Sequence, residues 1–494
     1  MTNQGFLGQP RGLATLFFTE MWERFSYYGM RAILILFMTT DAAQEGLALT
    51  TETAAAVYGL YTAGVYLLTL PGGWLADNIF GQRKAIYYGG IIIMLGHIVL
   101  AIPGNPIIFF LGLAFVAIGT GLLKPNISTI VGDLYPEGGA KRDAGFSIFY
   151  MGINLGAFLG QLIVPIVAAT VNWHVGFGLA ALGMFAGLIQ YRYTESSLGE
   201  LGIIPKAKEL SEAGKGTGNA TLGIGLALLL VGLLALLQFL GYIDLASAKG
   251  IAQGIGVVII LVTLFYFLYI LTAGGLTTEE KKKVVIIFML FVGAAIFWSG
   301  FEQAGSSLNL FARDHTDRLI MGWELPAGTL QSVGAFFIII FSPIMGALWV
   351  KLAARNMNPS TPLKFGFGLI LLGIGFLVMV FAAQIVAAGT KAGLFWLILT
   401  YFLHTIGELT LSPVGLSATT KLAPKRYVGQ MMGIWFVGAA LGNLIAGLYA
   451  GNFDKDNVQQ LPDLFMSVVT LSIGAGLIFL ILSPFAKKWM GEVE

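Results

Sequence analysis

The chain contains about fourteen apolar runs, each near the roughly 20 residues that a transmembrane helix needs. Hydrophobic residues make up 56% of the chain and charged residues only 11%, whereas soluble domains are about 25% charged. A membrane β-barrel would instead show segments of about 10 residues with alternating polarity. We therefore predict an all-α membrane protein with fourteen transmembrane helices. The predicted spans begin near Gly12, Thr53, Ala85, Ile107, Ala144, Trp173, Thr221, Gly250, Val284, Gly328, Pro362, Gly393, Val428 and Leu464.

The basic residues of the polar loops alternate in number from one side of the membrane to the other. With a cytoplasmic N-terminus, the loops on that side hold 20 of the 28 Lys and Arg residues, and the opposite loops hold 5. Short cytoplasmic loops are enriched in Lys and Arg. The first run is too long and too charged for a cleaved signal peptide. We expect a multi-pass protein of the cell (inner) membrane with both termini cytoplasmic.

Two polar intervals divide the runs into groups of six, two and six. The longer interval covers residues 191–219, and a second, LTTEEKKK, ends at Lys283. This spacing predicts three parts: an N-terminal six-helix bundle (1–198), a cytoplasmic linker with two extra helices (199–280), and a C-terminal six-helix bundle (281–494).

Short matches between the two groups of six suggest a parallel duplication. The fourth span of the first group contains IGTGLLKP (118–125), and that of the second contains IGELTLSP (406–413). The following spans contain FYMGINLG (149–156) and WFVGAALG (435–442). Ordered agreement over two successive spans favours an internal repeat, which is common in secondary transporters.

The first span carries the ionisable residues Glu20, Glu23, Arg24 and Arg31. Each such group costs roughly 2.5–3.5 kcal/mol at the bilayer centre on insertion scales, so none of them should face lipid. At 100° per residue the four fall within an arc of about 140°, which predicts a stripe aimed at other helices. The first three can pair with one another, which leaves a structural ion-pair network as an alternative to a functional role. Arg31 has no carboxylate three or four residues away and needs a partner from another span.

Three later spans each contain one isolated charge. Lys124 lies in the first half, and Glu302 and Glu408 lie in the second. A cavity between the halves would be basic on one wall and acidic on the other, which suits a zwitterion. His97 and His404 also lie inside spans, where we expect them to pack or to hydrogen-bond between helices.

Several function classes have no support in the sequence. There is no phosphate-binding loop, so direct use of ATP is not expected. There is no nucleophile–base pair and no metal-ligand spacing, and the chain has no cysteine. The net charge of +2 gives no reason to expect nucleic-acid binding. We expect a protein that is not an enzyme, has no cofactor or metal, and uses protons as the coupling ion.

Two motifs resemble those of a known family. GGWLADNIFGQRK resembles the major facilitator signature between spans two and three, and TEMWERFSYYGM resembles the E-x-x-E-R-F-x-Y-Y motif of proton-dependent oligopeptide transporters. FYMGINLG and GELTLSPVGLS resemble further signatures of that family. The similarity runs along the whole chain, and the two extra central helices are similar to the bacterial branch. The matched signature-loop residues, to which we assign gating, are Gly73, Asp77, Gly81, Arg83 and Lys84.

The resemblance implies a major facilitator fold and a proton-coupled symporter that imports di- and tripeptides by alternating access, acting as a monomer in the lipid bilayer. A symporter of the same fold for nitrate or another small charged or zwitterionic solute is the alternative. The resemblance also implies that Arg31 pairs with Glu302, and Lys124 with Glu408. The implied proton-coupling residues are Glu20, Glu23, Arg24, Glu302 and Lys124. The implied substrate-binding residues are Tyr28, Arg31, Tyr66, Lys124, Asn154, Trp298, Glu302, Glu408 and Trp435.

One position departs from the family pattern. The second span of the second half usually reads Gln-Ser, a spacer, then Asn, but here TLQSVGAFF has Gly334 at the place of the Asn. The change removes one amide from the expected pocket and leaves more room there. We expect bulkier substrate side chains to be tolerated.

Overall fold

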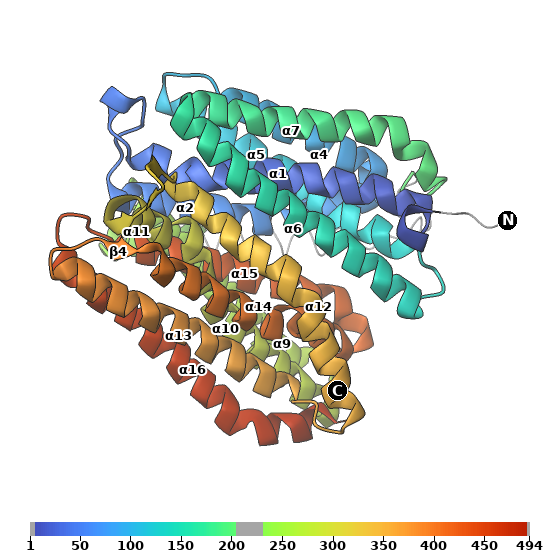
Figure 1. Cartoon of the computed structure of the whole chain (residues 1–494). Coiled ribbons are helices and arrows are strands. Elements are labelled where there is room, and N and C mark those ends of the chain that lie inside the picture. The colour runs from blue at the N-terminus through green and yellow to red at the C-terminus, as the bar shows by residue number, and fades with distance from the viewer. Residues whose placement is uncertain (1–4, 204–230, 492–494) are drawn as a thin grey trace.

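The computed structural model describes residues 5–203 and 231–491, and these are almost wholly helical (Figure 1). Helices predominate because a backbone inside a bilayer must satisfy its own hydrogen bonds. The α-helices are α1 (Arg11–Thr39), α2 (Thr51–Leu67), α3 (Thr69–Leu75), α4 (Gln82–Leu100), α5 (Pro106–Asp133), α6 (Gly139–Thr170), α7 (Trp173–Thr194), α9 (Ala248–Ala273), α10 (Thr278–Phe301), α11 (Ser307–His315), α12 (Ser332–Ala354), α13 (Thr361–Ala387), α14 (Leu394–Leu422), α15 (Val428–Ala450) and α16 (Leu461–Met490).

Short elements connect these helices. Strand β1 (Thr316–Asp317) pairs in parallel with β4 (Ala392–Gly393), and β2 (Leu319–Ile320) pairs antiparallel with β3 (Trp323–Glu324). Single turns of tighter or wider helix are η1 (Phe6–Gly8), η2 (Ala42–Gln44), η3 (Ala76–Phe80), η4 (Glu195–Leu198), η6 (Glu302–Gly305), η7 (Ala327–Gln331), η8 (Lys425–Tyr427) and η9 (Val458–Gln460).

Within the described residues, twelve helical stretches are long and apolar enough to cross a membrane. Helix α1 adds a thirteenth predicted span, which its charged residues exclude from that group. Every described helix that matches a predicted span begins within six residues of the predicted start. The run predicted to begin at Thr221 lies partly outside the described residues, although residues 231–239 are helical. The prediction of an all-α membrane protein is confirmed.

The helices form two groups that meet along one long interface (Figure 1). In the upper group α1 packs against α6 and α7, and α4 packs against α5. In the lower group α13 packs against α14 and α16, and α10 packs against α15. Contacts between α2 and α15 and between α6 and α12 join the two groups.

Two glycines from the matched sequence stretches allow close approach of helices in corresponding places. A Cβ atom at Gly156 of α6 would lie 2.1 Å from the Met21 carbonyl oxygen of α1. A Cβ atom at Gly442 of α15 would lie 2.5 Å from Cβ of Trp298 and 2.8 Å from the Ala295 carbonyl oxygen, both on α10. Each glycine thus holds the fifth span of its half against the first, which agrees with an internal repeat.

Candidate functional site

A cavity of about 140 Å³ lies between the two groups of helices, large enough for about five water molecules. Helices α1, α2 and α6 line it from one side, and α10, η6, η7, α12 and α14 line it from the other. Seven of the nine side chains predicted to bind substrate lie in its wall. These are Tyr28, Arg31, Tyr66, Asn154, Trp298, Glu302 and Glu408.

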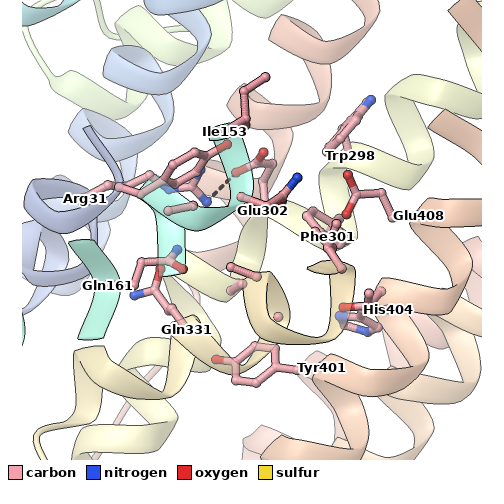
Figure 2. A pocket seen from close by; sticks show the side chains of 18 of the residues that line it. Arg31, Ile153, Gln161, Trp298, Phe301, Glu302, Gln331, Tyr401, His404 and Glu408 are labelled. Atoms are coloured by element: carbon pink, nitrogen blue, oxygen red, sulfur yellow. Dashed lines mark ion pairs between the residues drawn. The ribbon is translucent and has the colours of Figure 1, made fainter. Parts of the chain in front are cut away.

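Arg31 and Glu302 form a buried ion pair across the two groups of helices. Arg31 Nη2 lies 2.5 Å from Glu302 Oε2, and the side chains are only 7% and 5% exposed. Arg31 Nε also donates a hydrogen bond to the Tyr58 hydroxyl oxygen at 2.5 Å. Figure 2 shows the pair projecting toward the centre of the cavity. The partner that Arg31 lacks on its own helix is therefore supplied by the second half of the chain.

Glu408 lies on the opposite wall from Arg31 (Figure 2). It is carried by α14 and is 7% exposed, and its Oε2 has no hydrogen-bond partner among the described residues. A buried polar group without a partner costs free energy unless water or a ligand supplies the missing bond. Asn154 of α6 lines the same cavity and donates from Nδ2 to the Tyr150 carbonyl oxygen at 2.9 Å. The cavity is therefore bipolar, with a guanidinium on one wall and a carboxylate on the other.

Glu20, Glu23 and Arg24 form an ion-pair network on α1. Arg24 Nε lies 3.0 Å from Glu20 Oε1 and 2.5 Å from Glu23 Oε2, and all three side chains are buried. None of the three lines the cavity. The Arg24 guanidinium carbon lies 5.9 Å from the centre of the Tyr28 ring, and Tyr28 does line it. The network therefore contacts the cavity wall through the Tyr28 ring.

Lys124 lies on α5, and the structure places it outside the cavity wall. Its Nζ lies 4.2 Å from the centre of the ring of Tyr66, and Tyr66 itself lines the cavity. In the part of the chain that the structure describes, Lys124 forms no ion pair with Glu408. The predicted Lys124–Glu408 pair is thus wrong for this conformation, in which the Lys124 ammonium lies against the Tyr66 ring instead.

Trp435 is the second predicted substrate-binding residue that lies outside the cavity wall. Its ring fills the space above Gly415, where an added Cβ would lie 2.1 Å from Trp435 Cη2. It also meets the Phe365 ring at a centroid distance of 6.3 Å. The prediction that Trp435 lines the pocket is wrong for this conformation, because the absent side chain at Gly415 lets the indole pack between α13, α14 and α15.

The signature loop lies away from the cavity, at the turn from η3 into α4. Gly81 has φ 77°, a conformation that favours glycine. Arg83 donates from Nη1 to the Gly199 carbonyl oxygen and from Nη2 to the Glu195 carbonyl oxygen, both at 2.9 Å. Asp77 Oδ1 accepts from Gln82 Nε2 at 3.4 Å. Of the five matched residues, Gly73 lies in α3, Asp77 in η3 and Lys84 on the exposed side of α4.

The structure brings several polar residues to the site that the sequence did not single out. Gln161, Gln331 and Tyr401 are each more than nine-tenths buried and line the cavity. Gln161 lies seven residues after Asn154, and that spacing could have placed both on one face of α6. His404 also lines the cavity, and its ring packs against the Phe376 ring with the centroids 4.9 Å apart and the planes tilted by 36°. The packing role expected for His404 is thus present.

Comparisons with known proteins agree with this architecture. The sequence model described as the POT family matches residues 83–207 and 233–466. The peptide transporter YePEPT of Yersinia enterocolitica is 40% identical over 493 residues, covering 98% of this chain and 96% of the relative. A di-/tripeptide transporter of Lactococcus lactis is 38% identical over 502 residues, covering 100% of this chain and 99% of the relative.

A solved structure gives the same result. The crystal structure of a mutant peptide transporter POT in complex with alafosfalin has a TM-score of 0.88 and 40% identity, and the match covers 99% of this chain and 98% of that chain. The major facilitator fold implied by the signature motif is therefore present. Because the family model and full-length relatives agree, the chain belongs to the POT family of membrane transporters.

Proposed function

We propose that this chain is a proton-coupled symporter that imports di- and tripeptides by alternating access. The observation that carries the proposal is the buried Arg31–Glu302 pair, which faces the unpartnered Glu408 across one cavity. The names of the relatives and the alafosfalin-bound neighbour support a peptide substrate. A nitrate ion would give Glu408 no positive group to bind, so the bipolar cavity favours a zwitterion over nitrate.

The peptide lies between the two charged walls. Its C-terminal carboxylate binds Arg31, because a guanidinium presents paired donors to a carboxylate. Its N-terminal ammonium binds near Glu408, with Asn154 beside it. The rings of Tyr28, Tyr66 and Trp298 contact the backbone and side chains of the peptide.

Proton coupling follows from competition for Arg31. Glu302 is the counter-ion of Arg31. A substrate carboxylate that binds the Arg31 guanidinium leaves Glu302 buried without its partner. The Glu302 carboxylate then binds a proton from solvent. Each ligand therefore raises the affinity for the other, as linkage requires. Protons supply the driving force, and no other cofactor is needed.

The remaining predicted residues take supporting roles. Glu20, Glu23 and Arg24 connect through Tyr28 to the cavity and assist proton coupling. Lys124 acts on the site through the Tyr66 ring. The signature loop fixes the end of α3 against the start of α4 and against residues 195–203 during gating.

The proposed organisation is an N-terminal bundle (1–198), a linker with two extra helices (199–280) and a C-terminal bundle (281–494). The protein acts as a monomer in the cell (inner) membrane with both termini cytoplasmic. It is a transporter and not an enzyme, and neither metal nor nucleic acid takes part.

Uptake into proteoliposomes tests the proposal. Purified protein should accumulate labelled dialanine above equilibrium when the lumen is made alkaline relative to the bath, and a protonophore should abolish the accumulation. Excess unlabelled dialanine or trialanine should compete, and excess nitrate should not. If dialanine fails to accumulate and no peptide competes, the substrate assignment is wrong.

A further inference from the structure

A group of neutral polar side chains forms the end of the cavity that is nearer to η7 and the start of α14. Gln161 of α6, Gln331 of η7 and Tyr401 of α14 are 7%, 5% and 3% exposed. The side-chain atoms Gln161 Oε1, Gln331 Oε1 and the Tyr401 hydroxyl have no hydrogen-bond partner among the described residues. Buried polar atoms are almost always hydrogen-bonded in folded proteins, so three free ones at one place need an explanation.

Helix geometry separates these groups from Asn154 and Glu408. Gln161 lies seven residues after Asn154 on α6, and Tyr401 lies seven residues before Glu408 on α14. Seven residues are two turns, so each pair shares a face and is about 10 Å apart along its helix. The cavity therefore has two levels, with Asn154 and Glu408 at one and the three neutral groups at the other.

Gly334 leaves space between the two levels. It follows Gln331 by three residues, which puts both on one face, and a Cβ atom added there would meet only Thr405 Oγ1, at 4.0 Å. Figure 2 shows Gln161 and Gln331 close to Arg31, with Tyr401 beyond them. With the peptide carboxylate on Arg31, the side chain of the C-terminal residue is the part of the peptide nearest to these groups.

We propose that Gln161, Gln331 and Tyr401 form a subsite for a primary amide side chain on the C-terminal residue of the peptide. A primary amide has two N–H donors and one carbonyl acceptor. The two Oε1 atoms accept the two donors, and the Tyr401 hydroxyl donates to the carbonyl. An apolar side chain of equal length would displace water and leave all three groups unsatisfied. This subsite rests on the proposed function and adds a substrate preference to it.

The test is competition against labelled dialanine uptake by four peptides. The wild-type protein should bind Ala-Gln roughly three- to tenfold more tightly than Ala-Met, the range expected for one or two net hydrogen bonds. Gln-Ala and Met-Ala, which place the same side chains on the first residue, should compete about equally. The ratio of two inhibition constants is measured in one preparation, so a general loss of uptake cancels.

Three variants assign the preference to these residues. Gln161→Leu should bring the ratio of the Ala-Met to the Ala-Gln inhibition constant close to one, and its Oε1 has no hydrogen bond to another described residue to lose. Tyr401→Phe removes only the hydroxyl and should lower the ratio in the same direction. Gly334→Asn should weaken Ala-Gln more than dialanine, because it fills the adjacent space. Gln253→Leu, on α9 outside the cavity, is the matched control and should keep the wild-type ratio.

The outcomes distinguish failure of the subsite proposal from failure of the proposed function. If dialanine accumulates but the wild-type ratio is one, or if Gln161→Leu and Tyr401→Phe both keep the wild-type ratio, the subsite is overturned and the symporter proposal stands. The subsite is also overturned if Gln-Ala is preferred over Met-Ala by the same factor as Ala-Gln over Ala-Met, because the amide side chain would then be bound elsewhere. If neither dialanine nor any of the four peptides is transported or competes, both proposals fall together.

Discussion

The contact between α2 and α15 joins the two groups of helices, and Gly447 makes it possible. A Cβ atom at Gly447 would lie 2.6 Å from the Ala55 carbonyl oxygen, 2.6 Å from Gly59 Cα and 2.9 Å from Gly59 N. All three neighbours are backbone atoms, so they cannot rotate away. Since ordinary contact begins near 3.4 Å, the helices would have to separate by about 0.8 Å. Gly447→Val should therefore disfavour the closed α2–α15 contact.

Overpacking of this kind costs about 1–3 kcal/mol. We call the conformation in which α2 and α15 touch closed, and one in which they are apart open. If the open conformation avoids the clash, the ratio of closed to open protein falls by roughly five- to 150-fold. Gly64→Val is the matched control, because it adds the same side chain to α2 where a Cβ atom would meet nothing within 4 Å. The control should leave the ratio of closed to open protein unchanged.

Disulfide formation across the contact measures the closed fraction. The chain has no cysteine of its own, so Glu52→Cys with Gly451→Cys gives a single reporter pair. A Cβ atom at Gly451 would lie 3.5 Å from Glu52 Cα, within reach of disulfide geometry. Losing the exposed Glu52–Lys249 pair should matter little. Cross-linking at least fivefold slower is expected with Gly447→Val, and an unchanged rate would refute a backbone clash at this contact.

Two further predictions concern stability. Arg31→Leu and Glu302→Leu should each lower the unfolding temperature in detergent, because each leaves a buried charge unpaired at a cost of about 3–5 kcal/mol. The double variant should recover part of this loss. Strictly additive shifts of the two single variants would contradict a direct pair. Gly81→Ala should destabilise by about 1–3 kcal/mol, because φ 77° and ψ 150° is a glycine conformation and the added Cβ would lie 2.7 Å from the Ile203 carbonyl oxygen. Gly73→Ala, whose Cβ would meet nothing closer than 3.9 Å, is the control and should be neutral or slightly stabilising. Equal effects at both positions would show that the backbone conformation at Gly81 does not cause the destabilisation.

The sequence was sufficient for the helices because long apolar runs have few alternatives inside a bilayer. The inward stripe on α1 was also predictable, since Arg31 could not remain without a counter-ion among apolar neighbours. The structure supplied that counter-ion from Glu302, as the family resemblance implied. The matched glycines likewise marked contacts that the fold repeats, at Gly156 and Gly442.

The sequence was less informative wherever a position depends on how distant helices pack. Lys124 Nζ lies against the Tyr66 ring of α2 and forms no ion pair with Glu408 among the described residues, and no spacing within one helix indicates which of the two it meets. Trp435 turned toward Gly415 for a similar reason, because the space it fills is made by another span. Gln161 carries no charge, so its burial raised no conflict that hydropathy could detect.

The most direct test of the central claim, that Glu302 couples proton binding to substrate binding at Arg31, is transport by Glu302→Gln. The amide keeps the shape of the side chain but cannot take up and release a proton. We predict that gradient-driven dialanine accumulation is abolished while counterflow exchange of dialanine continues. If Glu302→Gln still accumulates dialanine against its gradient when the proton gradient is imposed, Glu302 is not the coupling residue.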